Sequence, residues 1–572
     1  MAGIYGVFLK EKETERFFEY LSPNPIVNEK VLLDGILGRS VIQKLENDRF
    51  FETKDGVTIC FEGVNLSDKF QKENAFTEYQ TSGIRLINEL KGSYCGFIFD
   101  EKKGEIFIFT DHLSTKNIFY YHNEKVGFIF SSELQSITKF LSDSKISCSI
   151  DRDAVYMMAL YGFLLEDHTY ANEIKKLHYS SVICYNLKSN SISISRNFEY
   201  RSSANEKIRK KDAINQLNSL FEQSVKKCWS KDLEYGNRHL SLLSGGLDAR
   251  TNVLVAKSLR FTDITAVTFG QFGSQDVKYA EEIAKGEKLN HFVRYLNNPS
   301  YLIDDIENNY IKPNDGLMMY HTSAHTSSTI RSLNLKPFSL LHTGQIGDVL
   351  LGSFSKENFN FEINKAKIGY TGNVRDKGLI DKIVSLKPIL EKYQDLGYEI
   401  YSYEQRQINA TIVGDRSLVN SIDNISPFYD LELINFCISL PSDFKKDQII
   451  YYEWLKEHHK NILNYSWEKI QMKPNKKFKM VYGKYYKKYI NGGKKYFNLS
   501  YDSMNPYAIW IKEFPFILLT LDKILENELQ RDYIDTELKS DLMKIYNDNV
   551  FEFRNKFAVV TALLALKLHF GQ

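Results

Sequence analysis

The sequence has few cysteines, no long apolar run and almost no net charge, and each shortage excludes a class of protein. The six cysteines are scattered singly, without CxxC spacing or paired clusters, which indicates reduced thiols in a cytoplasmic protein and not a disulfide framework. The longest apolar stretches, such as FAVVTALLALKLHF, fall short of the roughly 18–20 residues that cross a bilayer, and the first residues lack the segments of a signal peptide. A formal net charge of +2 argues against a stable nucleic-acid partner.

The 572 residues are more than one hydrophobic core usually holds, and their pattern changes once along the chain. Up to about residue 200, short apolar runs such as GEIFIFTD and SSVICYNL predict layered antiparallel sheets. From about Lys211 apolar residues recur at helical spacing, and strand, helix and strand patterns then follow in the order of βαβ units. We therefore predict an α+β domain over 1–205 and an α/β parallel-sheet domain over 206–572, with a helical region from about residue 500.

The stretch HLSLLSGGLDAR, residues 239–250, starts like a strand and continues like a helix, with two glycines at the joint. Backbone N–H groups at such a joint face outward at the positive end of the helix, and Ser244 adds a hydroxyl donor. Asp248 would repel a phosphate unless it held a Mg²⁺ ion that bridges to it, so the stretch favours pyrophosphate with metal. Ser-Gly-Gly alone fits a helix-capping turn without a ligand equally well.

Two further predicted strands end in similar residues, with Gly270 and Asp276 after TAVTF and with Gly344 and Asp348 after LLHT. The carboxyl ends of parallel strands meet at one crevice, where nucleotides bind. Asp248 and Asp348 are the predicted Mg²⁺ ligands. The predicted ATP-contacting residues are Leu242, Ser244, Gly245, Gly246, Asp248, Thr268, Phe269, Gly270, Asp276 and Gly344.

These motifs resemble a known family. SGGLDAR, TFG…SQDVKYAEEIA, TGQIGDVLLG and SPFYDLELINFCISLP are similar, in order and spacing, to the synthetase half of class B asparagine synthetases. LKGSYCGFIFD and TDHLSTKNIFYY resemble the glutamine amidotransferase domain of the same family, which has the Ntn-hydrolase αββα fold. The resemblance covers roughly residues 1–480 and implies a PP-loop ATP pyrophosphatase that uses ATP and Mg²⁺ to adenylate a carboxylate, after which an amine displaces AMP.

The N-terminal half departs from the family where glutamine would be hydrolysed. The family's nucleophilic cysteine after the initiator Met is Ala2 here, and a methyl group cannot attack an amide. The family's glutamine-holding residues are replaced in the regions FEGVN (61–65) and KENAFTEYQ (72–80). We therefore predict a silent glutaminase that is retained as a scaffold, so the amine must come from elsewhere.

The synthetase half departs from the family mainly on its acceptor side. The usual Ser after the Asp of the loop is Ala249, and the family's glutamate is Gln345, which can hydrogen-bond a substrate but cannot act as a base. Tyr320 replaces the arginine typical of aspartate recognition, so aspartate is a poor candidate substrate. The resemblance assigns charge compensation on pyrophosphate to a lysine, for which Lys469 is the best match and Lys473 its rival. The base is unidentified, with Tyr320 and His342 as candidates.

The predicted function is an ATP-dependent, AMP-forming carbon–nitrogen ligase, with a sugar acid of surface-glycan biosynthesis as the carboxylate by analogy. Two alternatives stay open: a peptide or lactam cyclase, in the manner of lasso-peptide cyclases and β-lactam synthetases, and a catalytically silent scaffold. The Lys/Tyr-rich stretch 473–497 fits a solvated helix, an acidic-peptide or anionic-lipid-linked substrate, or RNA. A homodimer is a further hypothesis.

Overall fold

The computed structural model describes residues 3–10, 17–21, 26–201, 204–354, 359–372, 374–418, 420–476, 478–479, 482–483, 503–548 and 553–571. Ala2 and residues 484–497 of the Lys/Tyr-rich stretch lie outside the described residues.

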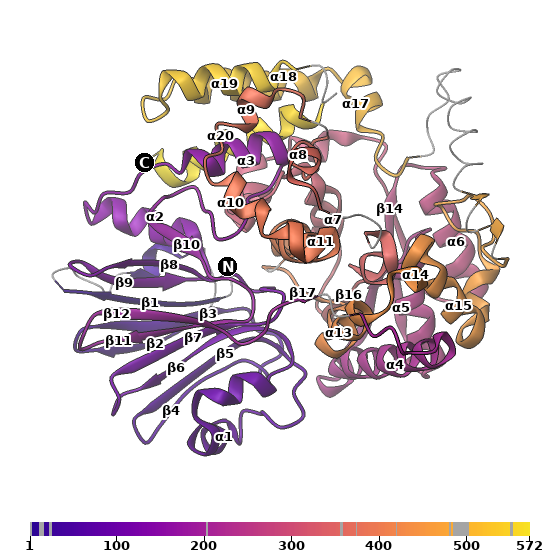
Figure 1. Cartoon of the computed structure of the whole chain (residues 1–572), viewed down its shortest axis with the longest axis horizontal. Coiled ribbons are helices and arrows are strands. Elements are labelled where there is room, and N and C mark those ends of the chain that lie inside the picture. Colours follow the sequence, from indigo (N-terminus) through magenta and orange to yellow (C-terminus); the bar gives the residue numbers. More distant parts are fainter. Residues whose placement is uncertain are drawn as a thin grey trace.

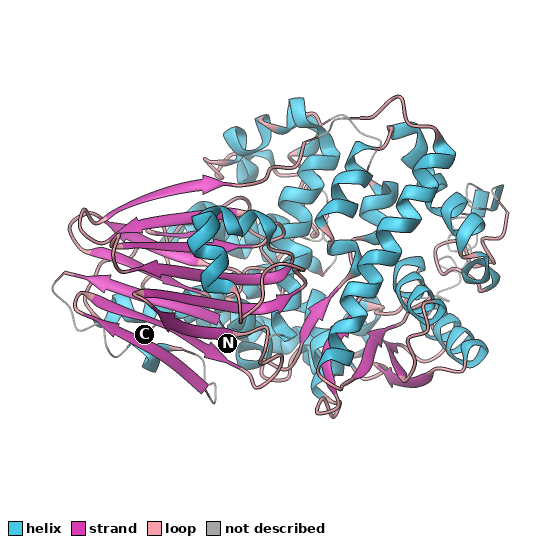
Figure 2. Cartoon of the chain, turned by 90° about the horizontal axis from the view of Figure 1, so that it is seen from below, coloured by secondary structure: helices cyan, strands magenta, loops and turns pink. Residues whose placement is uncertain are grey.

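The N-terminal half is a sandwich of two antiparallel six-stranded sheets (Figures 1 and 2). The first sheet has the order β10-β8-β9-β1-β3-β2 and the second has the order β12-β11-β7-β6-β5-β4. Their strands are β1 Gly3–Leu9, β2 Ile26–Leu32, β3 Gly35–Val41, β4 Phe50–Lys54, β5 Val57–Asn65, β6 Gly92–Asp100, β7 Glu105–Thr110, β8 Phe119–Asn123, β9 Gly127–Ser131, β10 Ile174–Lys176, β11 Ser181–Asn186 and β12 Ser191–Arg196.

Helices cover the outer face of each sheet and complete the layers. Strand β1 is buried on both faces, since Ile4 and Phe8 pack toward the second sheet while Tyr5 and Val7 pack in the core that includes the helices. The helices α2 Leu134–Asp143 and α3 Arg152–Tyr161 contribute to that core, and α1 Ala75–Ser82 covers the second sheet. The predicted αββα arrangement is confirmed.

The second half contains a five-stranded sheet of the order β15-β14-β13-β16-β17, in which every pairing is parallel. Helices α4 Lys210–Glu234, α5 Leu247–Ser258, α6 Gln275–Glu287 and α7 His321–Arg331 alternate with the strands β13 Arg238–Leu242, β14 Ile264–Gly270, β15 Asn290–Tyr295, β16 Phe338–His342 and β17 Asp423–Ile425. The chain order of β13, α5, β14, α6 and β15 is that of consecutive βαβ units, and the predicted α/β fold is confirmed.

A long, mainly helical segment separates β16 from β17, and further helices follow β17. The helices of these two stretches are α8 Phe361–Asn364, α9 Lys377–Ile380, α10 Leu386–Glu391, α11 Tyr393–Tyr401, α12 Ile412–Asp415, α13 Leu431–Ser439, α14 Ser442–Lys445 and α15 Ile449–His458.

The chain ends in the helices α17 Tyr507–Glu513, α18 Phe516–Leu529, α19 Thr536–Tyr546 and α20 Arg554–Phe570, as the sequence predicts. Helix α20 packs against α18 and α19 and also against α2 and α3 of the N-terminal half (Figure 1). The predicted boundary after residue 205 falls in the connection between β12 and α4. The last helices therefore join the two halves and do not belong to the second half alone.

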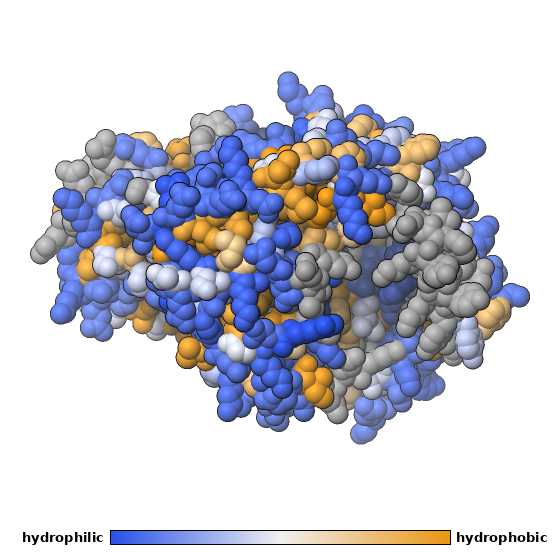
Figure 3. Space-filling model, turned by 90° about the horizontal axis from the view of Figure 1, so that it is seen from above, coloured by the Kyte–Doolittle hydropathy of each residue, from blue (hydrophilic) through white to orange (hydrophobic). Residues whose placement is uncertain are grey.

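The surface of the molecule seen from above is mostly hydrophilic, with apolar side chains in several separate groups (Figure 3). Leu519 of α18 is one exposed apolar residue, with 68% of its surface accessible. Among the described residues, no helix is long and apolar enough to cross a membrane.

Candidate active site

Three strand ends of the parallel sheet meet as the sequence predicts, and their glycines make the close approach possible. A Cβ atom on Gly344, after β16, would overlap the backbone nitrogen of Ala249 in α5. A Cβ on Gly347 would lie 2.8 Å from Cγ of Asp248. A Cβ on Gly245 would lie 3.1 Å from Cα of Asp276, at the start of α6. These contacts place the three predicted loops around one crevice edge.

The side chain of Arg250 supports the loop Ser244–Asp248, a role that the sequence analysis did not predict. Ser244 Oγ accepts a hydrogen bond from the Gly246 amide at 3.1 Å. The fully buried guanidinium of Arg250 donates to the carbonyl oxygens of Gly245 at 2.5 Å and Gly246 at 3.0 Å. Because these carbonyl oxygens are engaged by Arg250, the anion-facing side of the loop is left to N–H donors. Burial lowers the pKa of Arg250 to about 10, so it keeps its charge at neutral pH.

Arg250 also connects the loop to the segment that carries Lys469. Its guanidinium donates to the carbonyl oxygens of Tyr465 at 3.2 Å and Ser466 at 2.6 Å. The Glu468 amide in turn donates to the Gly245 carbonyl oxygen at 3.2 Å. Lys469 Nζ bonds Gln448 Oε1 at 2.9 Å and lies close enough to Asp248 for its charge to lower the pKa of that carboxyl group.

Lys473, the rival to Lys469, is solvent-exposed. The structure therefore brings Lys469 to the predicted phosphate loop. Its role in charge compensation stays a prediction.

The two predicted metal ligands lie side by side. Asp248 Oδ2 accepts a hydrogen bond from the Asp348 amide at 3.0 Å, and Asp348 Oδ2 accepts one from Ser353 Oγ at 2.7 Å. Asp248 Oδ1 is buried and no described donor meets it with full hydrogen-bond geometry, although the nearby Tyr451 hydroxyl favours the ionised carboxylate. Burial, and then the charge of Asp348, raise the pKa of Asp248 to about 8. Two adjacent carboxylates with an unsatisfied oxygen fit a hard divalent cation such as Mg²⁺, which would favour their ionised forms.

The other predicted nucleotide contacts lie on the same strand ends. Leu242 ends β13, and Thr268 in β14 donates from Oγ1 to the Leu243 carbonyl oxygen at 2.7 Å. Phe269 packs against His325 with ring centroids 5.0 Å apart, and Gly270 ends β14 with a positive φ of 153°. These contacts hold the edge in shape; the assignment of these residues to ATP stays a prediction.

Gln345 belongs to a network of neutral donors around a carboxyl group that the sequence did not reveal. Gln345 Nε2 donates to Asp415 Oδ1 at 2.6 Å. The Tyr429 hydroxyl lies 3.2 Å from Asp415 Oδ2 and also hydrogen-bonds Gln345 Oε1, and Asn424 Nδ2 donates to the same Asp415 oxygen. Burial raises the pKa of Asp415 to about 7, although the three hydrogen bonds act in the opposite direction. A carboxyl group with this pKa can exchange a proton near neutral pH.

Tyr320 is not part of this arrangement, which corrects the sequence prediction. Its ring is fully buried between Tyr310 and Phe557, with centroid distances of 5.8 and 5.5 Å, and its hydroxyl has no partner among the described residues. Burial raises its pKa far above the ordinary value of 10, so it cannot serve as a base at neutral pH. Its position beside α20 makes it a core residue.

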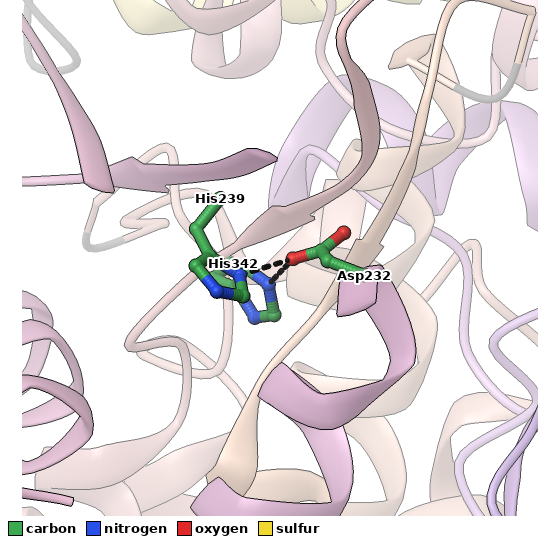
Figure 4. A group of neighbouring side chains, drawn as sticks. All are labelled: Asp232, His239 and His342. Carbon is green, nitrogen blue, oxygen red and sulfur yellow. Dashed lines mark hydrogen bonds and ion pairs between the residues drawn. The ribbon is translucent and has the colours of Figure 1, made fainter. Parts of the chain in front are cut away.

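His342, the other candidate base, is also excluded. It lies under the sheet in a fully buried group with Asp232 and His239 (Figure 4). Asp232 Oδ2 accepts from His342 Nε2 at 2.6 Å and from His239 Nδ1 at 2.8 Å. Ligand atoms around a tetrahedral Zn²⁺ at about 2.1 Å would stand roughly 3.4 Å apart, so these distances describe direct hydrogen bonds. The group is a polar core network that fastens α4 to β13 and β16.

Each half of the chain is similar to a known protein family. Residues 63–198 match the family of glutamine amidotransferase domains, and residues 216–313 match the asparagine synthase family. The two halves are therefore similar to the two domains of asparagine synthetases. One relative, asparagine synthetase (glutamine-hydrolyzing) 2 of Bacillus subtilis, is 24% identical over 423 residues, which are 64% of this chain and 53% of the relative.

A protein of Methanocaldococcus jannaschii, provisionally named asparagine synthetase (glutamine-hydrolyzing) 2, is 31% identical over 205 residues. The match covers 36% of this chain and 38% of that relative. The chain thus matches about half or less of the length of these relatives. A glutamine phosphoribosylpyrophosphate amidotransferase of B. subtilis matches at 10% identity over 46% of this chain and 51% of that chain, with a TM-score of 0.18.

Proposed function

We propose that this asparagine synthetase-like protein is an AMP-forming amide ligase that adenylates a carboxylate and transfers the acyl group to an amine that it does not make itself. The observation that carries the proposal is the meeting of the Ser244–Asp248 loop, Asp348 and Lys469 at one edge of the parallel sheet. This edge combines N–H donors, two carboxylates and a lysine, which together suit a departing pyrophosphate.

The residues of the loop orient the first step. The carboxylate substrate attacks the α-phosphorus of ATP, a C–O–P bond forms, and the bond to pyrophosphate breaks. The amides at the start of α5 and the Ser244 hydroxyl bind the departing pyrophosphate, and Lys469 balances its charge. Asp248 and Asp348 would hold Mg²⁺, which supplies charge neutralisation to the phosphate oxygens when bound.

The N-terminal half is proposed to be a scaffold without glutaminase activity. A buried ion cluster joins it to the synthetase sheet: Asp423 of β17 pairs with Arg49 and Lys116, and Arg49 Nε lies 3.2 Å from Glu62 Oε1. All four side chains are at least nine-tenths buried. The two cations lower the pKa of Asp423 to about 2. These residues therefore hold the halves together.

For the carboxylate we propose a sugar acid of surface-glycan biosynthesis. The alternative reaction is peptide or lactam cyclisation. An acidic-peptide or anionic-lipid-linked substrate would dock on the stretch 473–497. The test incubates the protein, ATP and Mg²⁺ with panels of uronic acids, acidic peptides and amino-acid-derived lactam precursors, and identifies the nucleotide product. AMP and pyrophosphate formed with one class support the proposal. ADP and phosphate would exclude adenylation, and no turnover with any class would favour the silent scaffold that Gln345 and Ala249 suggest.

A further inference from the structure

Two consecutive residues before helix α15 have a backbone conformation that is unusual for residues other than glycine. Asp447 has a φ of 57° and a ψ of 19°, and Gln448 has a φ of 61° and a ψ of 31°. A left-handed backbone costs energy where a side chain is present, and it persists where the surrounding packing fixes it. Because such strain clusters at functional sites, the contacts of this turn indicate its role.

Packing fixes the turn from two sides. Lys445, three residues before Gln448, is buried, and its Nζ lies 2.7 and 2.8 Å from the two carboxylate oxygens of Glu399. Gly352, four residues after Asp348, has a φ of 111°, and a Cβ atom on it would lie 2.1 Å from the Lys445 carbonyl oxygen. The turn therefore packs directly against the segment that follows one of the two predicted metal ligands.

The side chain of Gln448 reaches Lys469 from this turn. Gln448 is buried, with 2% of its surface accessible, and its Oε1 accepts a hydrogen bond from Lys469 Nζ at 2.9 Å. The same ammonium group lies 5.6 Å from the ring centroid of Trp467. Neither of these two partners carries a negative charge, so they fix the position of the lysine without neutralising it.

Tyr451, one turn further along α15, lies beside the other charged group of the phosphate loop. Its hydroxyl group is next to the Asp248 carboxylate and donates to Thr251 Oγ1 at 3.2 Å. Residues three apart lie on the same face of a helix, so Gln448 and Tyr451 form one polar face at the start of α15. This face contacts Lys469 and Asp248, which come from distant parts of the chain.

We propose that Gln448 is a positioning residue for Lys469, and that its strained backbone and neutral amide oxygen hold the lysine charge where pyrophosphate departs. The inference rests on the proposed function, because it concerns the same site. A carboxylate at 2.9 Å would pair with the lysine and compete with pyrophosphate for its charge. A glycine would fit the left-handed backbone without strain but would give Lys469 no acceptor. A neutral side chain of this length meets both requirements.

The first test uses two substitutions in the full-length protein, and their order distinguishes positioning from packing. Gln448→Glu keeps the size and reach of the side chain but adds a negative charge. Gln448→Asn stays neutral and tolerates a positive φ, but it is one methylene too short to reach Lys469. Calorimetric titration with inorganic pyrophosphate and Mg²⁺ should give a Kd that rises roughly tenfold or more in Gln448→Glu and about threefold in Gln448→Asn.

A side chain that only fills space would give the reverse order, because Glu has nearly the shape of Gln whereas Asn leaves a gap. That order would overturn the inference. Gln530→Glu and Gln530→Asn, at an exposed position after α18, are the matched controls and should leave the pyrophosphate Kd unchanged.

ATP–pyrophosphate exchange, measured with the carboxylate that supports it, gives the second readout. In Gln448→Asn the KM for pyrophosphate should rise several-fold while the KM for the carboxylate stays unchanged, because the proposed contact of Lys469 is with phosphate alone. The thermal unfolding midpoint should stay close to that of the unaltered protein, since asparagine adopts a positive φ readily. A loss of exchange that goes with a matching loss of thermal stability in both variants would assign Gln448 to the fold and overturn the inference.

An unchanged pyrophosphate Kd in both Gln448 variants, in a protein that catalyses exchange, would also overturn the inference and leave the proposed function standing. Absence of exchange by the unaltered protein with every carboxylate class would overturn the proposed function. The pyrophosphate Kd values would then still decide whether Gln448 controls the charge of Lys469, because binding is measured without turnover.

Discussion

The phosphate edge and the acceptor edge of the site are built in different ways. At the phosphate edge, the loop Ser244–Asp248 and its support Arg250 lie within one strand-to-helix joint, and Asp348 comes from the matching joint of the neighbouring strand. At the acceptor edge, Gln345 meets Asp415 and Tyr429, which are 70 and 84 residues away in the sequence. The first edge depends on local backbone geometry, and the second depends on how the long excursion after β16 packs back. Local backbone geometry restricts which residue types fit at the phosphate edge. The residues of the acceptor edge are less restricted, so they can be substituted more freely.

The largest effect is expected at the phosphate edge. Asp248→Asn removes one of the two negative charges that would hold Mg²⁺, and several kcal/mol of phosphate stabilisation depend on that ion, so ATP–pyrophosphate exchange should fall by about 1,000-fold or more. Asp395→Asn, on an exposed part of α11, is the matched control and should leave exchange unchanged. Exchange that survives in Asp248→Asn would show that this carboxylate holds no metal.

A smaller loss is expected when the support of the loop is altered. Arg250→Lys keeps a positive charge but loses the fork that binds the carbonyl oxygens of Gly245, Gly246 and Ser466. Because the same fork ties the loop to the segment of Lys469, exchange should fall by roughly 100-fold, or about 3 kcal/mol in transition-state stabilisation. Arg260→Lys, just beyond α5 and exposed, is the control. Equal rates in the two variants would mean that the loop keeps its shape without Arg250.

A buried and an exposed ion pair that both join the two halves should contribute differently to the free energy of unfolding. Asp423→Asn leaves the two buried cations Arg49 and Lys116 with Glu62 as the one carboxylate of the cluster and should lower the free energy of unfolding by about 3 kcal/mol. Glu432→Gln, which breaks the exposed pair with Lys91, should cost about 0.5 kcal/mol.

The sign of the pH effect follows from the depressed pKa of Asp423. The group contributes stability above its unfolded pKa of 3.8, and this contribution is lost as the pH falls from about 4 toward the folded value of about 2. The Asp423→Asn variant should therefore lack this part of the acid destabilisation. Chemical denaturation at pH 7 and pH 3 checks both statements, and equal stability of the two variants at pH 7 would show that the halves are held mainly by other contacts.

The phosphate edge was predictable from strand ends, glycines and acidic residues in the sequence. At a strand-to-helix joint, residues that are neighbours in the sequence are also neighbours in space. Arg250 could have been found too, since a long cation one helical turn after the loop can reach back to its carbonyl oxygens. Asp415 could not, because nothing in the local pattern links α12 to the loop after β16. The prediction failed for Tyr320 because its place depends on α20, which returns from the end of the chain to cover it. It failed for His342 because the side chain points under the sheet toward α4.

The smallest effect concerns the contact between the two residues of the acceptor edge. In Gln345→Glu, a second carboxyl group replaces the amide that donates to Asp415 at 2.6 Å, so the pair would share one proton and the ionisation that frees Asp415 would move to higher pH. With Asp415 as the base that accepts the proton of ammonia, the rise in the rate of amide formation should therefore shift upward by about one pH unit at a constant concentration of free ammonia, and the plateau rate should change little. A shift of that size corresponds to about 1.4 kcal/mol. Single-turnover decay of the adenylate measures the shift between pH 6 and pH 9, with ammonium chloride adjusted at each pH to keep free ammonia constant. Gln345→Met, which removes the hydrogen bond without adding a charge, should lower the rate while moving the profile less. A profile that moves to lower pH in Gln345→Glu would indicate that the new glutamate itself acts as the base, and the acceptor edge would then work without Asp415.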